Sequence, residues 1–173
     1  VQSMAFMPVF GLNNGMIPII SYNYGAQRPD RMKRTMKLGV MVGCSIMLFC
    51  LVIMQAFPGQ ILKIFDATDD MLFMGIPAVR IMSTAFIFAG FSVTCSGMFQ
   101  AVGKGVYSMI VSMARQLFVI LPVAYFLSKA MNSVNGVWTA FPIAEIFSVI
   151  ISTFLLLRVY KKIVKPLERG QIE

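Results

Sequence analysis

Four side chains that can bind solutes or carry charge lie inside long apolar runs: Asn14, Gln100, Arg115 and Glu145. Such side chains are costly against lipid, so they normally face a bundle interior or a water-filled pathway. The amides of Asn14 and Gln100 also need several hydrogen-bonding partners. We therefore predict that these four residues line or gate a pathway for substrate or ions. For Asn14, helix packing and cavity lining both remain open.

Arg115 and Glu145 are the two charges within the apolar runs. At 1.5 Å per residue, each lies about 12–13 Å from the near boundary of its run, on opposite sides of the membrane. Their depths in ~30 Å of hydrocarbon then differ by only about 5 Å. Two interpretations follow. Either they form an ion pair between neighbouring helices, or Arg115 extends to the membrane surface and Glu145 binds and releases a proton or cation.

Other polar and small residues share helical faces. Ser92, Ser96 and Gln100 recur every four residues and predict a narrow polar stripe. One face of the last apolar run is predicted to point inward, and it carries Trp138, Pro142, Glu145, Ser148 and Ser152. Two glycine pairs with the same spacing are expected to let another helix approach closely, namely Gly11 with Gly15 and Gly39 with Gly43.

The residue types present exclude several functions. The chain has no histidine, so neither a Ser-His-Asp nor a Cys-His active site can form within it. Cys44, Cys50 and Cys95 lack the spacing of metal ligands. Lysines and arginines stand in short blocks, whereas nucleic-acid-binding proteins present them on a face with interleaved aromatics. We predict neither an enzyme nor a nucleic-acid-binding protein, and no catalytic, cofactor or metal site.

Composition predicts an all-α polytopic membrane protein. Of the 173 residues, 58% are hydrophobic and 13% are charged, whereas soluble domains have about 25% charged residues. A surplus of apolar surface this large must face lipid. Runs close to the ~20 residues needed to cross the hydrocarbon predict five spans, at residues 1–22, 38–57, 81–102, 106–128 and 137–157.

The links between spans predict how they pair. Residues 103–105 alone join the third and fourth spans, which predicts a tight antiparallel hairpin. Residues 129–136 form another short turn. The longest link, residues 58–77, carries Asp66, Asp69 and Asp70, and its "ILKIF" segment can form a short amphipathic helix at the membrane surface.

Positive charge predicts the orientation. Eleven basic residues fall on one side of the membrane: Arg28, Arg31, Lys33, Arg34, Lys37, Lys104, Arg158, Lys161, Lys162, Lys165 and Arg169. Only Lys63, Arg80 and Lys129 fall on the other. The richer side is expected to be cytoplasmic, together with the C-terminus. An odd number of spans and an apolar beginning at Val1 are typical of the C-terminal part of a two-lobed transporter.

Four segments carry a resemblance to a known family. "GLNNGMIPIISYNYGAQRPDRMKR" resembles the eighth helix and following loop of the multidrug and toxic compound extrusion (MATE) family. "ILKIF", "FQAVGKGVYSMIVSMARQLFVILPVAYFL" and "GVWTAFPIAEI" resemble its later helices in order and spacing. The resemblance covers nearly the whole chain, and the bacterial DinF- or MepA-like branch looks nearest.

The resemblance implies that residues 1–173 form helices eight to twelve of a twelve-helix transporter. They would be a partial six-helix C-terminal lobe, with residues 158–173 as a basic cytoplasmic tail. Members expel cationic or amphipathic drugs in exchange for Na⁺ or H⁺ by alternating access. The implied partners are such drugs, the lipid bilayer, and the N-terminal lobe and helix seven of the same protein. The implied location is the bacterial plasma membrane.

One departure and one alternative accompany the resemblance. Some members place a cation-binding carboxylate in helix ten, but residues 81–102 contain none, so no ion site is assigned. The alternative is a lipid-linked oligosaccharide flippase of the same superfamily. Such a protein would have a larger and more cationic cavity, and Arg115 is the only cation inside a predicted span.

Overall fold

The structure is a computed structural model that describes residues 2–131 and 135–168, and every regular element in these ranges is helical. In chain order the elements are α1 (Gln2–Gly25), α2 (Pro29–Ala56), α3 (Pro58–Ile64), α4 (Asp69–Ser83), α5 (Phe86–Ala101), α6 (Gly105–Met113), η1 (Ala114–Ile120), α7 (Leu121–Met131), α8 (Asn135–Val159), η2 (Tyr160–Val164) and α9 (Lys165–Glu168). Here η denotes a π-helix, which has one more residue in each hydrogen-bonded turn than an α-helix.

Four continuous helices are long and apolar enough to cross a membrane: Gln2–Gly25, Pro29–Ala56, Gly105–Lys129 and Val137–Glu168. The bent pair α4–α5 makes a fifth if it is counted as one span. The prediction of an all-α membrane bundle is therefore confirmed. The last helix runs on to Glu168, into the predicted basic tail. Residues 169–173 of that tail, and residues 132–134 of the predicted last turn, lie outside the described residues.

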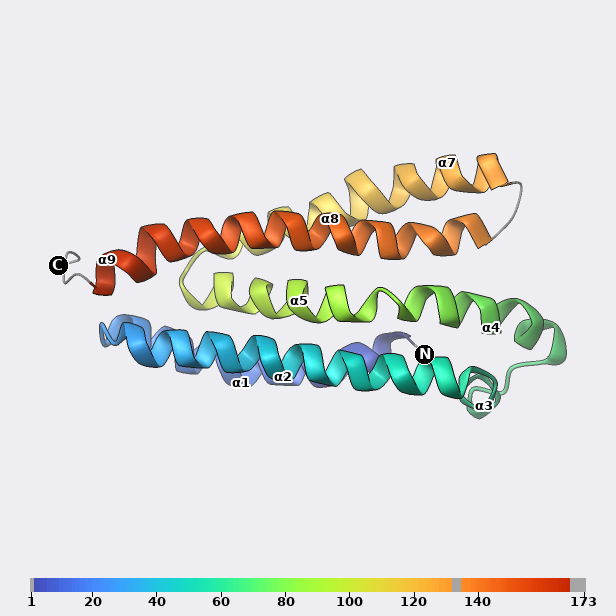
Figure 1. Cartoon of the computed structure of the whole chain (residues 1–173), viewed down its shortest axis with the longest axis horizontal. Coiled ribbons are helices and arrows are strands. Elements are labelled where there is room, and N and C mark those ends of the chain that lie inside the picture. The colour runs from blue at the N-terminus through green and yellow to red at the C-terminus, as the bar shows by residue number, and fades with distance from the viewer. Residues whose placement is uncertain (1, 132–134, 169–173) are drawn as a thin grey trace.

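Helix α5 lies in the middle of the bundle (Figure 1). Helices α1 and α2 pack against each other and against α5, while α8 packs against α5, η1 and α7. The α1–α2 turn, the α5–α6 turn and α9 lie together at one end of the bundle, and α3 lies at the other (Figure 1). The first end carries most of the basic residues.

Helices α4 and α5 meet at a bend of 55°, which lies inside the predicted third span. At this break the Thr84 hydroxyl donates to the Ile81 carbonyl at 2.6 Å, and the Ser83 hydroxyl donates to the Arg80 carbonyl at 3.0 Å. Gln55 of α2 donates its Nε2 to the same Arg80 carbonyl at 3.0 Å. Side-chain donors thus replace backbone donors at the point where the helix changes direction.

Helices α2 and α5 approach closely through glycines. A Cβ added at Gly90 would lie 2.9 Å from Met47 Cγ and 3.1 Å from the Gly43 carbonyl oxygen. A Cβ added at Gly43 would collide with Thr94 Oγ1, and one added at Gly39 would collide with Met16 of α1. The close packing predicted for Gly39 and Gly43 is therefore confirmed.

The expected packing of Gly11 and Gly15 is not found among the described residues. Both glycines are exposed, and an added Cβ at either would meet no atom within 4 Å. Helical spacing showed that they share a face but not which neighbour that face meets. The buried face of α1 instead carries Ala5, Val9, Asn13, Met16 and Ile20.

The turn between α5 and α6 depends on Gly103. Its φ of 72° lies in the left-handed region. The Gly103 N–H donates to the Gln100 carbonyl at 3.0 Å, and the Lys104 N–H donates to the Phe99 carbonyl at 2.8 Å. This is the Schellman arrangement that ends a helix at glycine.

Gly103→Ala is expected to destabilise the folded protein by about 1 kcal/mol, because alanine is strained at positive φ. Denaturant unfolding in detergent measures the change. Gly105→Ala is the matched control, since its Cβ would enter open space two residues away. Equal stability of the two variants would contradict the expectation.

The C-terminal segment packs onto the start of α2. Glu168 of α9 forms an ion pair with Lys33, and Lys33 Nζ lies 5.5 Å from the centre of the Tyr160 ring. Met32 is completely buried in the same apolar cluster as Val164 and Leu167. Segments more than 120 residues apart in the sequence therefore share one core at this end.

Candidate functional site

A polar cavity of about 320 Å³ lies between the α1 side and the η1–α8 side of the bundle. Its lining residues come from α1, α5, α6, η1 and α8: Phe6, Phe10, Asn13, Asn14, Ile17, Ser92, Val93, Ser96, Gln100, Ser108, Val111, Ser112, Arg115 and Ser148. Three of the four predicted pathway residues are among them. The predicted stripe of Ser92, Ser96 and Gln100 also faces this cavity.

The two predicted amides occupy different settings. Asn14 is exposed and lines the cavity, which favours cavity lining over helix packing for this residue. Gln100 donates its Nε2 to Ser108 Oγ of α6 at 3.1 Å. Sequence reasoning missed Ser108, although a signal was present. Gln100 and Ser108 are each four residues from Lys104, and such residues meet across a tight hairpin.

Asn13, the neighbour of Asn14, ties α1 to α5. Its Nδ2 donates to the Val93 carbonyl at 2.9 Å, and its side chain fills the space that a Cβ on Gly97 would need. Its Oδ1 is buried and accepts no hydrogen bond from the described residues. A buried amide oxygen at a cavity wall is available to a donor from a solute or from water.

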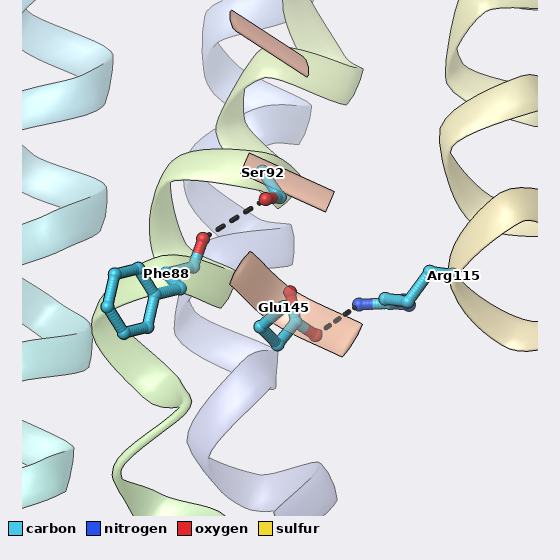
Figure 2. A network of polar contacts seen from close by, with 4 residues as sticks. All are labelled: Phe88, Ser92, Arg115 and Glu145. Atoms are coloured by element: carbon cyan, nitrogen blue, oxygen red, sulfur yellow. Dashed lines mark hydrogen bonds and ion pairs between the residues drawn. The ribbon is translucent and has the colours of Figure 1, made fainter. Parts of the chain in front are cut away.

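Arg115 and Glu145 form an ion pair between two of the helices that are long and apolar enough to cross a membrane. Arg115 Nη1 of η1 donates to Glu145 Oε1 of α8 at 2.8 Å. The Glu145 side chain is 10% exposed and the Arg115 side chain 27% exposed. Figure 2 shows the two side chains meeting between helices, near Ser92 of α5, which donates to the Phe88 carbonyl at 3.1 Å. Of the two interpretations, the structure therefore shows the ion pair.

The ion pair lies where two hollows adjoin. A second hollow of about 420 Å³ is lined by Arg115, Glu145 and the first residues of α1, including Gln2, Met7 and Phe10. Phe6, Phe10 and Arg115 line both this hollow and the polar cavity. Breaking or forming the ion pair would therefore alter the wall between the two spaces.

Several polar atoms at and beside the ion pair have no hydrogen-bond partner among the described residues. Arg115 Nε and Glu145 Oε2 are buried without a hydrogen-bond partner among the described residues, as are the hydroxyls of Ser148 and Ser152 on the same face of α8. The predicted inward face of α8 is therefore buried at Glu145, Ser148 and Ser152. Of these residues, Arg115 and Ser148 line the polar cavity, and Arg115 and Glu145 line the second hollow. In the described ranges no three histidine, cysteine or acidic side chains are grouped as metal ligands would be.

The family model described as MatE matches residues 1–126 of the chain. The chain belongs to the MatE family. It is 27% identical over 131 residues to the multidrug export protein MepA of Staphylococcus saprophyticus, an alignment covering 76% of this chain and 29% of the relative. It is 24% identical over 152 residues to the probable multidrug resistance protein YoeA of Bacillus subtilis, covering 87% of this chain and 33% of the relative.

Solved MATE transporters share the fold. The structure of the MATE multidrug transporter DinF-BH in complex with a dye matches with a TM-score of 0.82 and 31% identity, over 92% of this chain and 35% of that one. An inward-facing MATE transporter matches with a TM-score of 0.85 and 20% identity, over 98% of this chain and 39% of that one. The predicted family and its DinF- or MepA-like branch are confirmed.

The MatE chain spans about a third of the length of the curated relatives it matches. Its fold is therefore that of a partial lobe of a larger transporter. The structure brings Asn14, Gln100 and Arg115 to one cavity and Glu145 to Arg115. The π-helical segment that carries Arg115 had no signal in the sequence.

Proposed function

We propose that this chain forms one wall of the substrate pathway in a multidrug efflux transporter. The transporter would export cationic or amphipathic compounds in exchange for Na⁺ or H⁺ by alternating access. The observation that carries the proposal is the cavity in which Phe6 and Phe10 lie beside the amides of Asn13, Asn14 and Gln100. The names of MepA and YoeA, and the complex of DinF-BH with a dye, support drug substrates.

The cavity suits amphipathic cations better than large anions. Aromatic faces attract organic cations, and amide oxygens can accept their hydrogen bonds. Arg115 is the single cation among the described lining residues, and Glu145 compensates its charge. A flippase for lipid-linked oligosaccharides would need more positive charge here. The volume of about 320 Å³ is at the small end for a drug-sized ligand, so the rest of the transporter would supply the opposite wall.

We further propose a multi-pass location in the bacterial plasma membrane with the C-terminus in the cytoplasm. The α1–α2 turn and the α5–α6 turn lie at the same end of the bundle as α9 (Figure 1). The Arg28–Lys37 block begins in the first of these turns and continues into α2, and Lys104 belongs to the second. Cytoplasmic segments carry such an excess of lysine and arginine.

Asn14→Leu in the full-length transporter is expected to slow ethidium efflux from vesicles about tenfold, if one polar contact with the substrate is lost. Its fold should be unaffected, because Asn14 is exposed and its amide makes no hydrogen bond with another described residue. Ser45→Ala is the control: Ser45 is exposed on α2, and its hydroxyl donates only to the Met41 carbonyl. Efflux at the wild-type rate in Asn14→Leu would count against this wall of the pathway.

The coupling ion is tested by the same assay. Ethidium efflux is measured under a Na⁺ gradient and a H⁺ gradient applied separately. If the rate of ethidium efflux increases under one of the two gradients, that gradient identifies the coupling ion. If neither gradient changes the efflux rate, the antiport part of the proposal is wrong.

A further inference from the structure

A basic pocket of about 340 Å³ lies at the α9 end of the bundle, apart from the polar cavity. Segments distant in the sequence meet there: the end of α1, the α5–α6 turn, α6, and the junction of α8 with η2. The residues that line it are Tyr24, Lys104, Tyr107, Arg158, Val159, Lys162 and Ile163.

The pocket has an uncompensated positive charge. Lys104, Arg158 and Lys162 line it, and no described carboxylate does so. None of the three forms an ion pair with a described residue, and nearby Glu168 is already paired with Lys33. Three cations held around one small space repel each other, and an anion placed among them removes that repulsion.

The donors also suit an anion with several oxygens. The guanidinium of Arg158 can bind two oxygens at once, and the ammonium groups bind as compact charges. The hydroxyls of Tyr24 and Tyr107 add two neutral donors from half-buried rings. The Tyr107 ring is held edge-on against Phe99, with 6.0 Å between ring centres. Donors from separate elements thus converge on one space, which matches a tetrahedral phosphate better than a planar carboxylate.

We propose that Lys104, Arg158 and Lys162, with Tyr24 and Tyr107, bind a phosphate group that belongs to the head group of an anionic phospholipid. The pocket lies at the end of membrane-spanning helices, where lipid phosphates are concentrated and where basic pockets between helices bind them. A soluble phosphate would satisfy the same donors, so the test separates the two sources. The inference does not depend on which compounds the transporter exports.

The test measures lipid retained by the purified full-length transporter in native mass spectrometry, after incubation with phosphatidylglycerol or phosphatidylcholine. The wild type is expected to retain phosphatidylglycerol preferentially. The triple variant Lys104→Gln, Arg158→Gln, Lys162→Gln should bind it about a hundredfold more weakly, because each surface cation contributes about a factor of five. All three side chains are exposed, so their replacement should not disturb the fold.

The matched control removes the same charge from the same end. Arg31→Gln, Arg34→Gln, Lys37→Gln changes three exposed residues of α2 that do not line the pocket. This variant should retain phosphatidylglycerol. Equal loss in both triple variants, or equal retention of the two lipids by the wild type, would overturn the proposal, because binding would then follow net charge or membrane contact alone.

Three further measurements test the proposal. Thermal unfolding without lipid should show no loss of stability in either triple variant. Arg158→Lys, which keeps the charge but not the paired donors, should bind phosphatidylglycerol with intermediate affinity. Inorganic phosphate is added alone at millimolar concentration. If it stabilises the wild type as much as phosphatidylglycerol does, the lipid source is wrong and the site takes free phosphate.

Discussion

Arg115→Ala in the full-length transporter is expected to destabilise the folded protein by about 3–5 kcal/mol, since removing one partner of a buried ion pair leaves the other charge uncompensated. The remaining charge would be that of Glu145, whose side chain is only 10% exposed. Denaturant unfolding in detergent measures the loss. The second carboxylate oxygen, Oε2, already lacks a partner among the described residues, so the nearby chain offers Glu145 no substitute.

A double variant separates stability from transport. Arg115→Met with Glu145→Met removes both charges, and it is expected to recover most of the stability that Arg115→Ala loses, because apolar pairs replace buried ion pairs at little cost. If the ion pair gates the pathway, this variant should fold but fail to transport ethidium. Wild-type efflux in the double variant would limit the pair to a structural role.

Glu145→Gln tests the role of the negative charge of Glu145, separately from the size of its side chain. The amide keeps the size of the side chain and an oxygen that can accept from Arg115 Nη1. If drug efflux and its ion dependence both survive this change, Glu145 does not belong to the coupling pathway.

Gly90→Leu is expected to have the second large effect, a destabilisation of about 3 kcal/mol or more, because extra atoms in a close-packed contact force the backbone to move. A Cβ alone at this position would lie 2.9 Å from Met47 Cγ and 3.1 Å from the Gly43 carbonyl. Met47 can change rotamer, but the carbonyl belongs to the α2 backbone. Helices α2 and α5 would therefore have to separate, which thermal unfolding and expression level both report.

Gly105→Leu is the matched control for this substitution. An added Cβ at Gly105 meets no atom within 4 Å, so the same change of residue should leave stability within about 0.5 kcal/mol of the wild type. Gly90→Leu with Met47→Ala should recover part of the loss by freeing one of the two contacts. If Gly90→Leu and Gly105→Leu had equal effects on stability, the close approach of α2 and α5 would not limit the size of the side chain at position 90.

Features that depend on one helix were predictable from residue spacing. The stripe of Ser92, Ser96 and Gln100 reaches the cavity because α5 keeps α-helical geometry over these residues. The pairing of Arg115 with Glu145 was one of two interpretations, since helix rise gives the depth of each charge but not the direction of its side chain. Deciding between them needed the arrangement of η1 against α8.

Features that depend on a neighbour were not predictable. Gly11 and Gly15 have the same spacing as Gly39 and Gly43, yet only the second pair meets another helix among the described residues. The 55° bend at Thr84 depends on hydrogen bonds from Ser83, Thr84 and the distant Gln55. Serines and threonines occur throughout these spans, so their sequence does not single out the position at which Gln55 of α2 supplies a donor.

The packing of the C-terminal segment onto α2 has a consequence for biosynthesis. A membrane protein emerges from the ribosome with its N-terminal helices first. Met32 is covered by a cluster that includes Val164 and Leu167, and Lys33 is paired with Glu168. Some 130 further residues must therefore be synthesised before this end of α2 can make its final contacts. Helix α9 therefore completes the packing of this end of α2. A chain truncated before Ile163 would lack Val164, Leu167 and Glu168, and would leave Met32 and Lys33 without these neighbours.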